Sequence, residues 1–169
     1  MLKKIGLIAL AFLAGILLGG VGTMAYSGYT LAHGMFILQD MDLSRAEDSA
    51  TQAYLNESAE VGIWALEHYL DFYEAVIKQR TEAIEGTSEE AKKVFLFADP
   101  NLRWVTYIRL GILYEKVGDM SKRDISFEKA KELFGAKAED ENINEQMIKI
   151  VKKFDEKIKL NEFETNQEE

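Results

Sequence analysis

Residues 102–117 read LRWVTYIRLGILYEKV, and this stretch decides the fold. Apolar side chains occupy most of it, and only a narrow strip of Arg103, Thr106 and Arg109 is polar. A helix that is apolar nearly all round lies at the centre of a bundle or is exposed as a binding face. The stretch therefore predicts one helix that is either the middle of a helical core or a docking surface.

A second helix follows directly and returns along the first. Gly118-Asp119 turns the chain, and Phe127, Ala130 and Phe134 then recur at helical spacing up to Gly135. Glycine commonly ends a helix because it tolerates a left-handed backbone. Residues 104–135 are thus expected to form a hairpin of two helices.

This hairpin resembles a tetratricopeptide repeat, a helix-turn-helix unit of about 34 residues. The resemblance rests on Leu110-Gly111-Ile112-Leu113-Tyr114, on the Gly118-Asp119 turn and on Phe127-Glu128-Lys129-Ala130. Arg123 departs from the pattern, since a small residue normally stands there, and Gly135 replaces the usual proline. The match covers about residues 104–135, and no second copy is visible. It implies a hairpin that stacks on neighbouring helices, because one repeat cannot bury its own faces.

The resemblance also implies a partner-binding groove, because first-helix residues line the groove in this family. The matching positions here form one set of five: Val105, Ile108, Ile112, Glu115 and Lys116. The alternative is that the three apolar members of the set pack on the preceding helix as core.

The rest of the chain predicts an all-α fold of about five helices. One helix is expected to end near Tyr54, and a longer aromatic helix to run from a cap at Asn56 to Gly86. A short helix should follow from Thr87 and end before Asp99-Pro100, and a last amphipathic helix should begin near Ile143. The helical domain is assigned to residues 27–160 and a disordered tail to 161–169.

Residues 1–26 contain the strongest signal for location. Lys3 and Lys4 precede Ile5 to Tyr26, a run without a charged side chain. About 20 such residues span a hydrocarbon core of about 30 Å. The basic start predicts a cytoplasmic N-terminus, a single-pass inner-membrane anchor, and a helical domain in the periplasm or outside the cell.

Two further features of the segment bear on its role. Thr23 and Ala25 also fit a cleavable signal peptide, in which case the protein is secreted after cleavage before Tyr26. Ala11, Gly15 and Gly19 recur every four residues and could pack against another transmembrane helix, either in a homo-oligomer or in a larger complex.

Composition excludes several classes of partner and site. The net charge is −9, which disfavours a nucleic-acid partner. The chain has no cysteine, which excludes disulfides, thiolate metal sites and lipid attachment through cysteine. His33 and His68 belong to no metal-binding spacing, and no catalytic residue, cofactor or metal is predicted.

Three functional hypotheses follow. The leading one is a membrane-anchored, tetratricopeptide-like adaptor that binds a protein or peptide. The second is a structural subunit of a membrane complex, assembled through its transmembrane helix and the aromatic face near Trp64. The third is a hydrolase or metal-dependent enzyme that uses Glu67, His68 and Asp71, which lie within about one turn of a helix.

Overall fold

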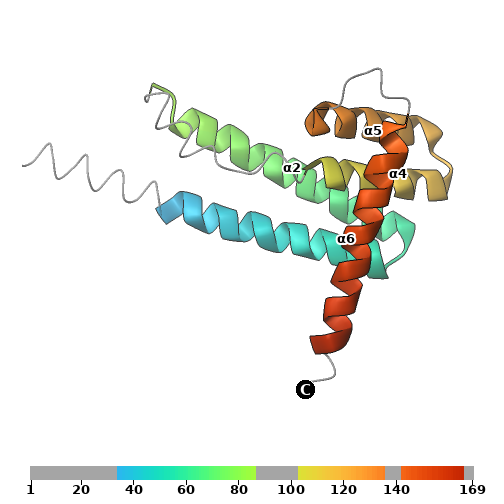
Figure 1. Ribbon diagram of the computed structural model, residues 1–169. Helices are drawn as coiled ribbons and strands as arrows, with labels where there is room; N and C mark the ends of the chain where they lie inside the picture. The colour runs from blue at the N-terminus through green and yellow to red at the C-terminus, as the bar shows by residue number, and fades with distance from the viewer. Residues whose placement is uncertain (1–33, 87–102, 136–141, 166–169) are drawn as a thin grey trace, which may run out of the picture. The chain divides into compact units, whose positions relative to one another are not determined.

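The computed structural model describes residues 34–86, 103–135 and 142–165, and these form five helices and no strand (Figure 1). The all-α class is therefore confirmed. The first described helix covers residues 34–56 and is followed by α2 (Ala59–Ala83), α4 (Arg103–Val117), α5 (Met120–Phe134) and α6 (Ile143–Thr165). The short helix predicted from Thr87 lies outside the described residues.

The chain divides into two compact units, Met1–Met41 and Asp42–Glu169. Residues 34–41 are the only described part of the first unit, and they begin the helix 34–56. Helices α2, α4, α5 and α6 all belong to the second unit. None of the described helices is both long and apolar enough to cross a membrane. The predicted anchor, residues 1–26, lies outside the described part of the chain.

Two predicted helix ends need correction. Ser58, not Asn56, caps α2, and its hydroxyl accepts a hydrogen bond from the Val61 amide at 3.4 Å. Asn56 remains in the preceding helix and donates from its side chain to Gln52 at 2.8 Å. At the other end of the domain α6 continues to Thr165, beyond residue 160, where the disordered tail was expected to begin.

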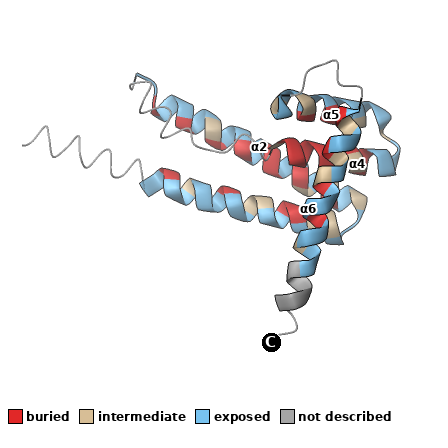
Figure 2. Ribbon diagram, viewed as in Figure 1, coloured by how far each residue is buried: buried red, intermediate tan, exposed pale blue. Residues whose placement is uncertain are grey.

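Helix α4 is the central element of the second unit. It packs against α2, α5 and α6, and most of its length is buried (Figure 2). This resolves the choice left by its apolar sequence in favour of a central core helix. The core side chains around it come from four other helices: Leu43 and Ala50 of the helix 34–56, Leu66, Tyr69, Leu70, Tyr73 and Val76 of α2, Phe127 and Ala130 of α5, and Ile143, Met147 and Val151 of α6.

The α4–α5 hairpin depends on glycine at two places. A Cβ added to Gly111 would lie 2.2 Å from the nearest carbon of the Phe127 ring, so only glycine allows this close approach of the ring to α4. Gly118 has φ +81°, a left-handed conformation that favours glycine, and it turns the chain. Asp119 then caps α5 by accepting the Lys122 amide at 3.1 Å.

A buried polar network joins three of the helices. The Arg109 guanidinium of α4 donates to Asp155 of α6, with its Nη2 at 2.6 Å and its Nε at 3.1 Å from the same carboxylate oxygen. Its Nη1 donates to the Thr51 hydroxyl of the helix 34–56 at 2.8 Å. All three residues are buried. A charge this deep is tolerated only when it is paired and hydrogen-bonded, so the network fixes these helices to one another.

Tyr54 completes this network. Its ring lies 5.3 Å from the Arg109 guanidinium carbon, and its side chain hydrogen-bonds Asp155. Burial raises the pKa of Tyr54 to about 12, the negative charge of Asp155 adds to the rise, and the positive charge of Arg109 opposes it. The phenol therefore stays neutral at physiological pH.

Substitution of Gly111 tests the hairpin packing. Gly111→Ala should lower the free energy of unfolding by roughly 1–3 kcal/mol, the usual cost of overpacking, because the methyl group enters the space of Phe127. Gly34→Ala is the matched control, since no atom lies within 4 Å of a Cβ there. Urea unfolding followed by circular dichroism measures both. Equal stability of the two variants would contradict this packing.

Removal of one partner from the ion pair tests the buried network. Asp155→Ala should cost roughly 3–5 kcal/mol, because it leaves the Arg109 charge buried and unpaired. The double variant Arg109→Met with Asp155→Ala should recover much of that loss. Urea unfolding of both variants gives the comparison. A double variant less stable than Asp155→Ala alone would show that Arg109 does not depend on Asp155.

Candidate functional site

An apolar groove lies between the helix 34–56 and α2. It has a volume of about 500 Å³ and is named here the Trp64 groove. Small residues of the first described helix line one side, and larger residues of α2 line the other. The lining residues are Ala46, Ser49, Ala50 and Ala53 on the first side, and Val61, Trp64, Ala65, His68, Tyr69 and Phe72 on the second.

Trp64 is the most prominent side chain of this groove. It is 66% exposed, and its ring stacks on His68 with centroids 5.4 Å apart and planes 8° from parallel. Val61 and Phe72 are also exposed. A tryptophan held in one orientation by a stacked neighbour, beside two other exposed apolar side chains, is typical of a binding surface rather than of scattered surface apolar residues.

Spacing along the two helices explains the groove. The small residues recur at helical intervals on one face of the helix 34–56, so their side of the groove is smooth. Tyr69 lies at the base, where it is buried and hydrogen-bonded to Glu47 of that helix. Burial, followed by the charge of Glu47, raises the pKa of Tyr69, so the phenol remains a neutral donor.

A second cleft, of about 520 Å³, lies between α2, α4 and α5. Its two sides have opposite charge, with carboxylates on α2 and lysines on α5. Tyr107 and Tyr114 of α4 also line it. The charged residues are Glu67, Asp71 and Glu74 on one side and Lys122 and Lys129 on the other.

Contacts within this cleft already use much of its charge. The Tyr114 hydroxyl donates to Glu67, and the Lys122 ammonium lies 3.8 Å from Glu67 and 5.1 Å from the Tyr114 ring centroid. Lys129 lies 5.3 Å from the Tyr107 ring centroid. Burial, followed by the hydrogen bond to Glu67, raises the pKa of Tyr114. These contacts connect α2 to the hairpin, which gives the cleft a structural role.

The five residues predicted to bind a partner on α4 are in different environments. Val105 and Ile108 are buried, and Ile112 is partly buried against the core. Their burial favours the core interpretation over an open groove, because α2 and α6 pack on α4. Only Glu115 and Lys116 of the set are exposed.

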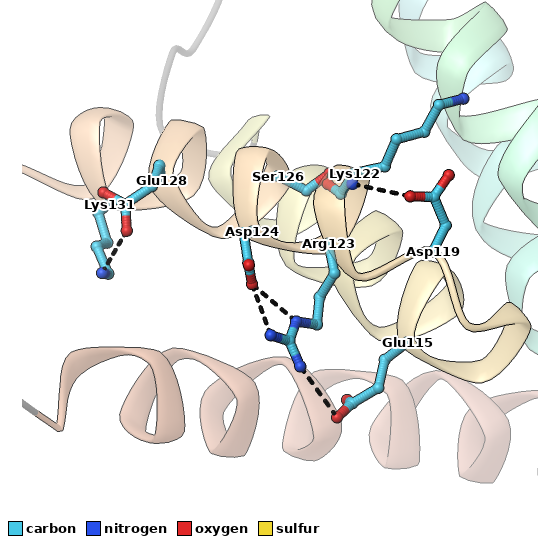
Figure 3. Close-up of polar contacts among 8 residues, drawn as sticks. All are labelled: Glu115, Asp119, Lys122, Arg123, Asp124, Ser126, Glu128 and Lys131. Carbon is cyan, nitrogen blue, oxygen red and sulfur yellow. Dashed lines mark hydrogen bonds and ion pairs between the residues drawn. The ribbon is translucent and has the colours of Figure 1, made fainter.

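The two exposed members, Glu115 and Lys116, have different surroundings. Glu115 is 3.8 Å from the Arg123 guanidinium, which also contacts Asp124 at 2.7 Å (Figure 3). Lys116 lines a pocket of about 230 Å³ with Lys152 and Lys159.

The three residues of the enzyme hypothesis are divided between two surfaces. Glu67 and Asp71 line the charged cleft, whereas His68 lies in the Trp64 groove, stacked on the indole. His68 therefore lies on a different surface from the two carboxylates with which the enzyme hypothesis grouped it. No cluster of His, Asp and Glu in the described ranges could hold a metal ion. Ala11, Gly15 and Gly19, predicted to pack against another membrane helix, lie outside those ranges.

The sequence did not identify the Trp64 groove as a groove. It predicted only that the aromatic face near Trp64 contacts partners in a membrane complex, and in the structure Val61, Trp64 and Phe72 of that helix are exposed. The sequence signal that could have indicated the groove is the number of apolar positions in α2, which is larger than one face needs. Leu66 and Tyr73 form a second, buried face of this helix. When a helix has two apolar faces and packs only one of them in the core, the other remains available for a further contact.

Comparison of the chain with models of known protein families, with curated proteins and with solved structures finds no match. The resemblance of residues 104–135 to a tetratricopeptide repeat thus remains a prediction, and the functional argument rests on geometry.

Proposed function

We propose that this chain is a protein-interaction adaptor that docks a partner in the Trp64 groove. The exposed indole beside an apolar groove of about 500 Å³ is the observation that carries the proposal. Tryptophan is enriched among the residues that dominate binding energy, and a single one at the centre of an interface contributes roughly 2 kcal/mol or more. Partner docking would bury the indole, which is now left in water.

The proposed adaptor is tethered to the cytoplasmic membrane by residues 1–26, with its helical domain on the outer side of that membrane. Support for the tether comes from the uncharged run after Lys3 and Lys4. The helical domain would then meet partners in the periplasm or at the cell exterior. A tether suits such a role because it confines both partners to one surface and raises their effective concentration.

A structural subunit of a membrane complex is the second candidate, because an exposed indole is equally expected of an obligate interface that lacks its partner. The mass of the protein after solubilisation in mild detergent separates the two. A stable larger assembly supports the subunit, and a bare monomer supports the adaptor.

Site-specific photo-crosslinking in the host cells tests the proposal. A photoreactive residue at position 61 or 72 of the full chain should capture the same protein, because both positions line the groove and are exposed. Position 132, exposed on α5, is the matched control and should not capture it. Capture of the same protein with equal yield at position 132, or no capture from the groove, would refute docking at this surface.

A further inference from the structure

We infer that the partner's docking element is an amphipathic helix whose apolar stripe is flanked by lysines or arginines. This inference rests on the proposed function and specifies the chemistry of the occupant. It combines the shape of the Trp64 groove with the charges that border it.

The shape of the groove fits a helix. Its lining extends over residues 46–53 of one helix and 61–72 of the other, which correspond to roughly 10 and 16 Å of helix axis. Alanine and serine on the first side allow a third helix to approach closely. The exposed side chains of Val61, Trp64 and Phe72 on α2 would then pack against an apolar stripe on the incoming helix, as in other helix-in-groove complexes.

The border of the groove on α2 is acidic. Glu60, Glu67 and Asp71 are exposed, and they stand four residues before, three after and seven after Trp64. These offsets place the three carboxylates beside the indole on α2, at the edge of the groove where Glu67 and Asp71 also line the neighbouring charged cleft. Glu67 already accepts the Tyr114 hydroxyl and lies 3.8 Å from the Lys122 ammonium, so Glu60 and Asp71 contribute most of the charge at this border. The border would therefore attract cations from an incoming helix.

The first described helix contributes little to oppose this charge. Arg45 is the exposed cation nearest in sequence to the small-residue side, and its guanidinium lies 3.9 Å from Asp42. A basic helix thus meets net negative charge along the α2 side of the groove.

The same charges oppose the other occupants. A second copy of this chain has a net charge of −9 and would bring like charges together. An anionic lipid surface would be repelled for the same reason. A helix with cationic flanks combines the apolar contact with electrostatic attraction.

The test uses the full chain in nanodiscs of zwitterionic lipid and two labelled helical peptides. Both peptides carry the same leucine stripe, flanked by lysine in one and by glutamate in the other. Fluorescence anisotropy should show at least tenfold tighter binding of the lysine peptide at low salt. The advantage should shrink in 0.5 M NaCl, where the Debye length falls to a few ångströms. Equal affinities, or no binding of either peptide, would overturn the inference.

Variants at exposed positions locate the binding. Trp64→Ala should weaken the lysine peptide at least tenfold, and Glu60→Lys with Asp71→Lys should shift the preference toward the glutamate peptide. Glu128→Lys on α5 changes charge away from the groove and is the matched control, with no expected effect. Similar losses in the control and the groove variants would overturn the inference.

Two further measurements distinguish the other occupants. A dimer in light scattering that Trp64→Ala dissolves, or a blue shift of indole emission on anionic vesicles, would replace the basic helix by a second copy or a lipid surface. If crosslinking from positions 61 and 72 captures one protein but the captured segment is acidic, the adaptor proposal stands and this inference fails.

Discussion

The buried pairing of Arg109 with Asp155 is the constraint on which the rest of the structure depends. A guanidinium in the core must be neutralised there, so α6 has to place Asp155 beside α4, and the helix 34–56 has to bring Thr51 to the remaining nitrogen. The network thereby commits α4 to the interior. Because α2 and α5 cover its remaining faces, α4 has little surface left for a partner.

The open apolar groove of the domain is instead lined by α2 and the helix 34–56. Helix α2 buries Leu66 and Tyr73 against α4, and it still has apolar side chains on the face toward the alanines of the helix 34–56. Tyr69, hydrogen-bonded to Glu47, joins those two helices at the base of the groove. Core packing and the proposed partner docking therefore involve different faces of one helix. Substitution of exposed groove residues should leave the core intact.

Helix positions and the hairpin turn could be predicted from the sequence, because they depend on local features such as Gly118-Asp119 and the spacing of Phe127 and Ala130. The environment of Arg109 could not. The sequence places it on a polar strip with Thr106, yet both are buried, and the partner of Arg109 lies 46 residues away on another helix. The Trp64 groove escaped prediction for a related reason: periodicity finds apolar faces but does not say which face another helix covers.

Helix α4 is interior, whereas the groove beside Trp64 is open. The chain has two tryptophans, and they report on these two places separately, since Trp104 begins the buried part of α4 and Trp64 is exposed. Acrylamide quenching of the variants Trp64→Phe and Trp104→Phe is the most direct measurement. Trp64, which the variant Trp104→Phe retains, should be strongly quenched, whereas Trp104, which the variant Trp64→Phe retains, should be protected. Protection of Trp64 with ready quenching of Trp104 would contradict this arrangement.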